Sequence, residues 1–277
     1  MKKWVGIVLL VLLLAACDGA SSISKQEEES NEEKKTEQSE KNKENENTKK
    51  EEEQKDNKTT EPASTTPEQP QYQLTGNWSF EPFGDANPKV ALITIDDAPD
   101  NHGVEMAKTL KDLDAPAIFF VNGHFIDTPE GAEELKKIHE MGFPIGNHTY
   151  SHSSLPDLSQ EEQKEEIIGL NDRIEEIIGE RPKFFRAPFG QNTEYSKQLA
   201  VEENMLLMNW TYGYDWNQEY MDATKLADIM VNTDLLGNGA NLLMHDREWT
   251  AKALPDIVQG LKDKGYELLD PALIKTP

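Results

Sequence analysis

The sequence is poor in cysteine and in basic residues. Its 277 residues include one cysteine, Cys17, which excludes a disulfide within the chain, a metal site built from cysteines and a thiol nucleophile in a folded domain. Lysine and arginine number 28 against 52 aspartates and glutamates, and the formal net charge is −24 at pH 7. This excess of acid argues against nucleic acids and anionic lipid headgroups as partners.

The sequence also lacks an apolar run long enough to span a bilayer as a helix. The run from Trp4 to Ala16 falls short of the roughly 20 residues that a spanning helix needs. Two lysines precede this run, which is the pattern of a secretory signal. Its ending, Leu14-Ala15-Ala16-Cys17, resembles the bacterial lipobox. We expect a lipoprotein signal peptide at residues 1–16 and a lipidated Cys17 that anchors the protein to the outer face of the cell membrane; the alternative is an ordinary signal peptide.

Residues 17–75 contain few apolar side chains and are dominated by Glu, Lys, Asn, Gln, Thr and Ser. Such a composition cannot bury enough surface to offset the loss of chain entropy on folding. We therefore expect a disordered acidic and polar tether that gives the protein reach from the membrane. Residues 76–277 are long enough for one domain with a sizeable core, which we expect to be monomeric.

The remaining sequence alternates between short apolar runs and segments with helical periodicity. Strands are predicted at 90–95, 117–121, 144–146, 184–185, 205–210, 241–244 and 266–269. Helices are predicted at 104–113, 132–141, 160–178, 194–202, 223–231 and 253–264. Repeated strand-then-helix units imply a parallel sheet. The fold class is therefore α/β, a distorted and lean (β/α) barrel of about seven parallel strands, because a full eight-stranded barrel takes about 250 residues.

Several polar residues fall at or just after the predicted carboxyl ends of these strands, where parallel barrels carry their chemistry. They are Asp96, Asp97, His148, Arg186 and His245. Asp96 and Asp97 are adjacent on a strand end, so their side chains point in different directions and can serve two roles. Alone, such a pair is more often a helix cap or a turn.

A second pattern is the spacing of His148 and His152. Histidines four residues apart lie on one side of a helical turn and can share a metal ion, although a lone pair of this kind is as often exposed or in the core. With Asp97 they would form a site of two histidines and one carboxylate. Three protein ligands leave a position open, which is the arrangement of a catalytic zinc.

Five short motifs occur in a fixed order: Thr94-Ile95-Asp96-Asp97, His148-Thr149-Tyr150-Ser151-His152, Arg186-Ala187-Pro188-Phe189-Gly190, Asp215-Trp216 and Leu243-Met244-His245-Asp246. Together they resemble the five motifs of the NodB-type polysaccharide deacetylases, carbohydrate esterase family four, over about residues 90–246. This chain departs from the family pattern at two positions. Ala98 stands where the family usually has glycine, and Tyr212 stands where the fourth motif usually has an acid.

The resemblance implies a metal centre with a base beside it. Asp97, His148 and His152 would bind a divalent metal ion, for which zinc is the expected identity. Asp96 would be the general base. Arg186 would keep that carboxylate ionised and oriented.

The resemblance also implies an acid and a substrate pocket. His245 would protonate the leaving amine, and Asp215 would raise the pKa of that histidine. The backbone N–H of Phe189 would stabilise the tetrahedral oxyanion. Trp216 and Leu243 would form the walls of a small pocket for the acetyl methyl group.

Three functions are compatible with these residues. The first is removal of N-acetyl groups from an N-acetylglucosamine-containing envelope polysaccharide such as peptidoglycan. The second is a catalytically weak or inactive lipoprotein that binds wall glycan, which the departures at Ala98 and Tyr212 keep open. The third is a metal-dependent hydrolase of a cyclic imide or amidine, which the secretion signal disfavours because those metabolites are cytoplasmic.

Overall fold

The computed structural model describes residues 69–277. The predicted signal peptide, Cys17 and most of the predicted tether lie outside the described residues. Among the helices of residues 69–277, none is both long enough and apolar enough to cross a membrane.

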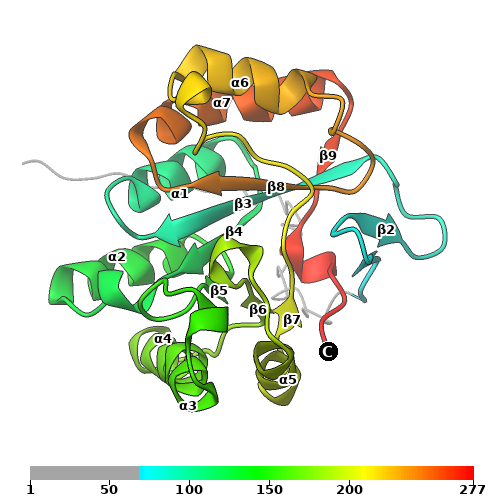
Figure 1. Ribbon diagram of the computed structural model, residues 1–277. Helices are drawn as coiled ribbons and strands as arrows, with labels where there is room; N and C mark the ends of the chain where they lie inside the picture. Colours follow the sequence, from blue (N-terminus) through cyan, green and yellow to red (C-terminus); the bar gives the residue numbers. More distant parts are fainter. Residues whose placement is uncertain (1–68) are drawn as a thin grey trace, which may run out of the picture. The chain divides into compact units, whose positions relative to one another are not determined.

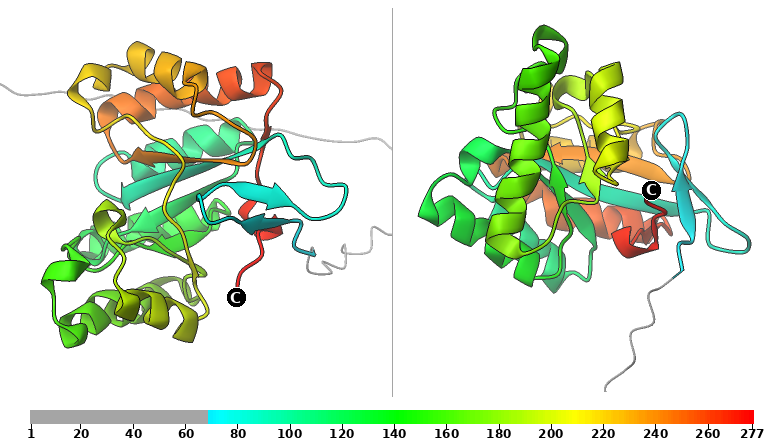
Figure 2. Two further views of the ribbon diagram at one scale, coloured as in Figure 1. Left: turned by 45° about the vertical axis from the view of Figure 1, so that its right-hand side comes forward. Right: turned by 90° about the horizontal axis from the view of Figure 1, so that it is seen from below.

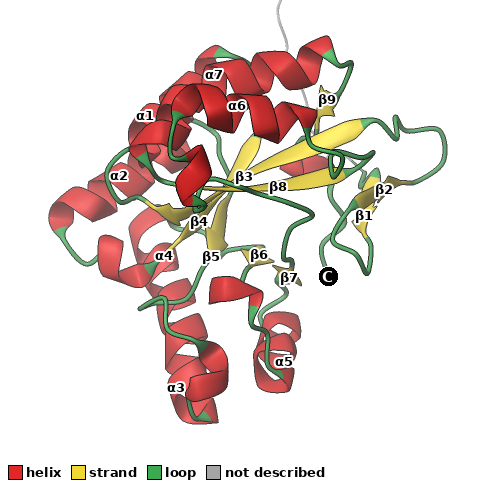
Figure 3. Ribbon diagram, turned by 45° about the horizontal axis from the view of Figure 1, so that its top comes forward, coloured by secondary structure: helices red, strands yellow, loops and turns green. Residues whose placement is uncertain are grey.

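A sheet of seven strands organises the described residues (Figure 3). Its order is β7-β6-β5-β4-β3-β8, with β9 beside the start of β3, and all of its pairings are parallel. The strands are β3 (Val90–Ala98), β4 (Ala117–Val121), β5 (Ile145–Asn147), β6 (Phe184–Phe185), β7 (Leu206–Leu207), β8 (Ala240–His245) and β9 (Glu267–Leu268). The seven predicted parallel strands are confirmed, although the one predicted at 205–210 is paired as a strand only over β7.

The segment after β7 brings the two edges of the sheet together. Thr211 donates its backbone N–H to the carbonyl of Asn241 on β8 at 2.9 Å, and Leu243 donates to the carbonyl of Tyr212 at 2.9 Å. Tyr212 and Leu242 thereby form a parallel bridge. The chain leaves β6 and β7 on one edge and reaches β8 on the other. The sheet is thus curled into the lean, distorted barrel that the sequence predicts.

Helices cover the outside of this sheet (Figure 1). They are α1 (Gly103–Asp112), α2 (Pro129–Glu140), α3 (Gln160–Lys164), α4 (Leu170–Ile178), α5 (Glu194–Glu202), α6 (Ala223–Asn232) and α7 (Glu248–Asp263). Helices α6 and α7 pack against each other on the side of β8. The helix predicted at 160–178 contains a π-helical turn, η3 (Glu165–Gly169), and the helix predicted at 253–264 begins already at Glu248. Single-turn 3₁₀ segments are η1 (Gly123–Phe125), η2 (Leu155–Asp157), η4 (Pro188–Gly190), η5 (Gln218–Tyr220) and η6 (Pro271–Leu273).

Strand β3 shows how side-chain alternation divides the core from the site. All nine of its residues are buried. Ala91, Ile93 and Ile95 pack in the core cluster that includes the helices, whereas Leu92 packs in a second cluster with residues of β4 and β6. Because successive side chains on a strand point to opposite faces, Asp96 shares the face of Leu92. The side chain of Asp96 therefore points into the barrel near the C-terminal end of β3.

A small hairpin precedes the sheet and corrects the predicted domain boundary. Strands β1 (Tyr72–Leu74) and β2 (Phe80–Pro82) pair antiparallel, and β1 lies beside the C-terminal segment in both views of Figure 2. The side chain of Tyr72 is 3% exposed, and Tyr72 forms a parallel bridge with Ile274. The folded part of the chain therefore begins a few residues before the predicted start at residue 76, because β1 and its buried Tyr72 belong to it.

Candidate metal centre and active site

The polar residues predicted at strand ends meet at one end of the barrel. They surround a cavity of about 500 Å³ that is open to solvent. Its lining residues are Asp96, Asp97, His148, His152, Phe189, Trp210, Asp215, Trp216, Leu243, His245 and Arg247. Every predicted site residue of the domain is in this set except Arg186, which is fully buried and touches Asp96 from the barrel interior.

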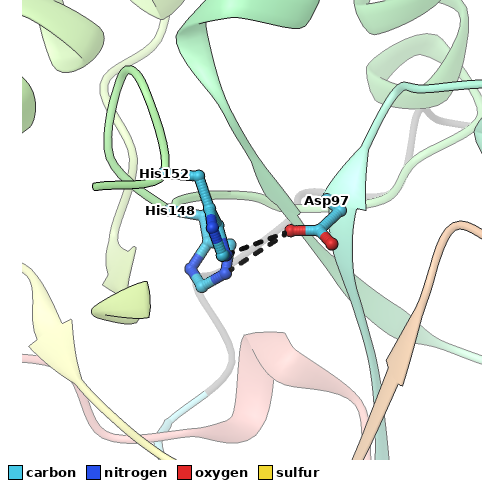
Figure 4. Close-up of side chains that lie close together, drawn as sticks. All are labelled: Asp97, His148 and His152. Carbon is cyan, nitrogen blue, oxygen red and sulfur yellow. Dashed lines mark ion pairs between the residues drawn. The ribbon is translucent and has the colours of Figure 1, made fainter. Parts of the chain in front are cut away.

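The three predicted metal ligands face one another (Figure 4). The Nε2 atoms of His152 and His148 lie 3.4 Å and 3.8 Å from Oδ1 of Asp97. The two imidazole rings are 5.0 Å apart between centroids. The predicted helical turn between them is wrong, because residues 148–152 form a loop after β5. Thr149 and His152, at φ 66° and 60°, bend this loop so that both rings reach the same oxygen.

Left-handed backbone marks this site at residues other than glycine. Asp97, His152 and Phe189 have φ values of 59°, 60° and 58°. Such values are uncommon for residues with a Cβ and persist only where the surroundings hold them. All three residues line the cavity, so the free-energy cost of left-handed backbone falls on residues that face the cavity.

The π-helical turn η3 holds the loop that carries His152. The carboxylate of Glu166 accepts hydrogen bonds from the backbone N–H of Ser151, at 2.8 Å, and from its hydroxyl. The backbone carbonyl of Glu166 accepts from the N–H of Tyr150 at 3.0 Å. Irregular helical turns of this kind often occur at functional sites. Here the irregular turn brings both the side chain and the carbonyl of one residue onto the loop.

The donor atoms suit a divalent metal ion. His148 Nδ1 lies 2.7 Å from the backbone carbonyl oxygen of Arg186, which fixes the proton on Nδ1. The lone pair of Nε2 is then free, and Nε2 lies 3.6 Å from Oδ2 of Asp96 and 3.8 Å from Oδ1 of Asp97. Burial lowers the pKa of His148 to about 3, so its imidazole is neutral, as a metal ligand must be. Oδ1 of Asp97 is buried and has no hydrogen-bond partner. A buried carboxylate oxygen without a partner that faces two imidazole nitrogens fits a zinc-like ion.

Asp96 and Arg186 form a buried ion pair. Nη1 of Arg186 donates to Oδ1 of Asp96 at 2.6 Å and to the hydroxyl of Thr94 at 2.7 Å. The guanidinium also stacks on the ring of Phe120, 4.3 Å from its centroid. Burial raises the pKa of Asp96 above its usual range, and the charge of Arg186 limits the rise. A carboxylate with a raised pKa is a better proton acceptor than an ordinary aspartate.

His245 and Asp215 form a second pair that lines the same cavity. His245 ends β8, and Asp215 lies in the loop between β7 and η5. Oδ1 of Asp215 lies 2.7 Å from Nδ1 of His245, and Oδ2 accepts the backbone N–H of His245 at 2.6 Å. The hydroxyl of Thr250 also donates to Oδ2 at 2.8 Å. Burial acts to lower the pKa of His245, but the hydrogen bond and charge of Asp215 outweigh it and raise that pKa. The geometry therefore favours a protonated imidazole.

The cavity wall combines aromatic and aliphatic side chains. Leu243 is buried, whereas Trp216 and Phe189 are 50% and 61% exposed. Trp216 packs edge to face with the ring of His245 and with that of Trp210. Trp210 lines the same cavity and is absent from the set predicted from sequence. An amphipathic wall of this kind suits a ligand with both apolar and polar faces.

The two departures from the family pattern lie away from the cavity. Ala98 is fully buried at the end of β3. Tyr212 is 3% exposed, packs in the main core cluster and donates its hydroxyl to the carbonyl of Met230 at 2.7 Å. Neither side chain lines the cavity. The substitution at Tyr212 therefore changes packing between β8 and α6 and leaves the cavity walls in place.

Arg247 is a cavity residue that sequence reasoning missed. It directly follows the fifth motif and is the residue before α7. Its Nη2 donates to Oδ2 of Asp97 at 2.8 Å, across 150 residues of sequence. The only signal in the sequence is its position next to His245 and Asp246, which gives no indication of a contact with the end of β3.

The comparisons with known proteins agree with this geometry. The family model for polysaccharide deacetylases matches residues 83–208. A peptidoglycan-N-acetylglucosamine deacetylase of Bacillus cereus is 30% identical over 209 residues, which cover 72% of this chain and 75% of the relative. The chain belongs to the polysaccharide deacetylase family. Membership places it among the hydrolases of carbohydrate esterase family four.

Proteins similar to this chain include one without catalytic activity. The crystal structure of BA3943 from Bacillus anthracis, a pseudoenzyme of carbohydrate esterase family four, is 26% identical with a TM-score of 0.61 and covers 68% of this chain and 67% of its own. The uncharacterized protein YlxY of Bacillus subtilis is 31% identical over 68% of this chain, and the match spans 58% of its length. Activity within the polysaccharide deacetylase family therefore has to be argued from the residues of each site.

Proposed function

We propose that this protein is a metal-dependent hydrolase that removes N-acetyl groups from an N-acetylglucosamine-containing envelope glycan such as peptidoglycan. One observation carries the proposal. A carboxylate oxygen without a partner faces two imidazoles, and an Asp–Arg pair and a His–Asp pair lie around the same cavity. Metal ligands, a base and an acid in one cavity are the parts that amide hydrolysis requires.

Asp97, His148 and His152 are the residues that would hold the ion. When bound, a divalent ion supplies Lewis acidity, which polarises an acetamide carbonyl and makes a neighbouring water a better nucleophile. Asp96 would accept a proton from the attacking water. Arg186 holds Oδ1 of Asp96 at 2.6 Å, so Oδ2 remains the oxygen available for that proton.

His245 would donate a proton to the amide nitrogen as the carbon–nitrogen bond breaks, because an amine anion is too poor a leaving group. The products are acetate and a free amine on the sugar. Asp215 fixes the imidazole through Nδ1 and leaves Nε2 as the donor. Trp216 and Leu243 would enclose the acetyl methyl group, and the N–H of Phe189 would stabilise the oxyanion.

We further propose that the protein acts at the outer face of the bacterial cell membrane as a lipoprotein. The support is the resemblance of Leu14-Ala15-Ala16-Cys17 to a lipobox. The test is detergent-phase partitioning of the full chain and of the Cys17→Ser variant. Loss of partitioning, or accumulation of an unprocessed precursor, is expected in the variant. Unchanged partitioning of the variant would reject the anchor.

A second candidate function is glycan binding without turnover. The observation that favours it is the exposed aromatic pair of Trp216 and Phe189, together with similarity to a pseudoenzyme. The two functions are separated by incubating the protein with peptidoglycan and with acetylated chito-oligosaccharides. Equal amounts of released acetate and new free amine support the hydrolase. Retention on peptidoglycan with neither product supports the binding protein.

A further inference from the structure

The guanidinium of Arg247 contacts the oxygen of Asp97 that faces away from the histidines. Oδ2 accepts a hydrogen bond from Nη2 of Arg247 at 2.8 Å, whereas Oδ1 faces both imidazoles and has no hydrogen-bond partner. Nη1 of Arg247 donates to the carbonyl of Asp246 at 3.0 Å and lies 3.6 Å from a carboxylate oxygen of Asp100. The arginine is thus held beside the site by its chain neighbour Asp246 and by Asp100 in the loop between β3 and α1.

Arg247 is also the one lysine or arginine among the described residues that line the cavity. Its side chain is 36% exposed, and that of Asp97 is 13% exposed. A charge-assisted hydrogen bond at this depth is only partly screened by solvent. One negative charge on Asp97 is therefore already compensated by a positive charge that belongs to the protein.

We propose that Arg247 is a built-in counter-cation of the metal site, which weakens metal binding and makes the ion exchangeable. A divalent ion bound by Asp97 would share that carboxylate with the guanidinium of Arg247, so the like charges of the ion and the guanidinium would repel each other. The inference rests on the metal site of the proposed function. It concerns how tightly the ion is held.

Orientation of the ligand is the competing role of Arg247. Asp97 lies in an irregularity of β3, with φ 59°, between Asp96, which pairs with His245 on β8, and Ala98, which pairs with Val121 on β4. The paired neighbours fix the backbone on either side of Asp97. Arg247 adds a hydrogen bond and a positive charge to its carboxylate, and variants that separate the two distinguish orientation from charge.

The experiment measures the zinc dissociation constant by competition with a chromophoric chelator, using the full chain at fixed pH and ionic strength. Arg247→Met removes the charge and the hydrogen bond, Arg247→Gln removes the charge but keeps a donor, and Arg247→Lys keeps the charge. Lys252→Met is the matched control, because it removes an exposed cation from α7, the helix that begins directly after Arg247. Circular dichroism of the metal-free proteins establishes that each variant is folded.

The Met and Gln variants are expected to bind zinc at least about tenfold more tightly than the wild type, with the Lys variant and the control within about threefold of it. Higher ionic strength should reduce the difference. Weaker binding by the Met variant, with the Gln variant unchanged, would show that Arg247 orients Asp97 and would overturn the inference, as would equal binding by all variants. If the wild-type protein binds no zinc and releases no acetate, the proposed function is overturned as well. If the wild type binds zinc and releases acetate, a negative result with the variants overturns only the role proposed for Arg247.

Discussion

Replacing Asp96 with asparagine should separate the base from the metal ligands. Asp96 and Asp97 are neighbours in sequence and both lie within 4 Å of Nε2 of His148, at 3.6 Å and 3.8 Å, but their other contacts differ. Asp96 pairs with Arg186 in the barrel interior, whereas Asp97 faces the two histidines. Asp96→Asn keeps the shape of the side chain and removes its charge and its capacity to accept a proton. We expect the variant to retain its metal and to lose turnover by roughly 10²–10⁴-fold.

The same substitution should lower stability, because it leaves a buried cation without its anion. The side chain of Arg186 is 0% exposed, and its other partners are neutral oxygens, among them the hydroxyl of Thr94 and the carbonyl of Asn209. Breaking a buried ion pair by removing one partner typically costs about 3–5 kcal/mol. The amide oxygen of asparagine can still accept one hydrogen bond from Arg186. We therefore expect a loss near the lower end, about 3 kcal/mol.

The assay combines urea unfolding, metal content by mass spectrometry and acetate release, with Asp97→Asn as the matched control. The control should lose metal affinity, regain part of its activity in excess metal and lose less stability, since its partner Arg247 is 36% exposed and can be solvated. The reasoning is refuted if Asp96→Asn loses its metal while Asp97→Asn keeps it. It is also refuted if the control is the less stable of the two.

Three further predictions follow from the contacts around the cavity. Activity should fall as pH rises through the raised pKa of His245. Asp215→Asn should lower that pKa and so move the alkaline limb of the pH–rate profile to lower pH. An alkaline limb that does not move would contradict the pairing of His245 with Asp215. Glu166→Gln should loosen the His152 loop and weaken zinc binding by about tenfold, measured by chelator competition, with Glu165→Gln as a control of unchanged affinity. In urea unfolding, a chain that begins at residue 76 should lose about 2 kcal/mol or more of stability relative to one that begins at residue 69, because it lacks the buried Tyr72. Equal stability of the two chains would support a domain that begins at residue 76.

The sequence predicts this fold well because the signals that define it are local. Apolar runs bounded by polar residues marked β3 and β4, and the repeated strand–helix order predicted a parallel sheet. The hairpin of β1 and β2 escaped prediction, since three-residue strands carry little periodicity. Its burial depends on Ile274, about 200 residues away in sequence.

The candidate site was predicted from strand ends, from the spacing of two histidines and from the resemblance of five motifs to a family, and the structural reason given for the histidine spacing was wrong. His148 and His152 do converge, and they do so through left-handed turns in a loop and not through a helix. The loop depends on Glu166 of η3, a tertiary contact that the spacing does not encode. Arg247 was missed for a similar reason, because only the folded chain brings the start of α7 to the end of β3. Local pattern thus identified ligand types, while the residues that hold them required the structure.

The most direct test of the account is acetate release from acetylated peptidoglycan by the protein after its metal has been removed and then restored. Metal-free protein should release no acetate above background, and added zinc or another divalent ion should restore release, with one free amine formed for each acetate. Release of acetate that persists in the metal-free protein would contradict the metal-dependent mechanism. Zinc-loaded, folded protein that releases none would contradict the proposed hydrolase.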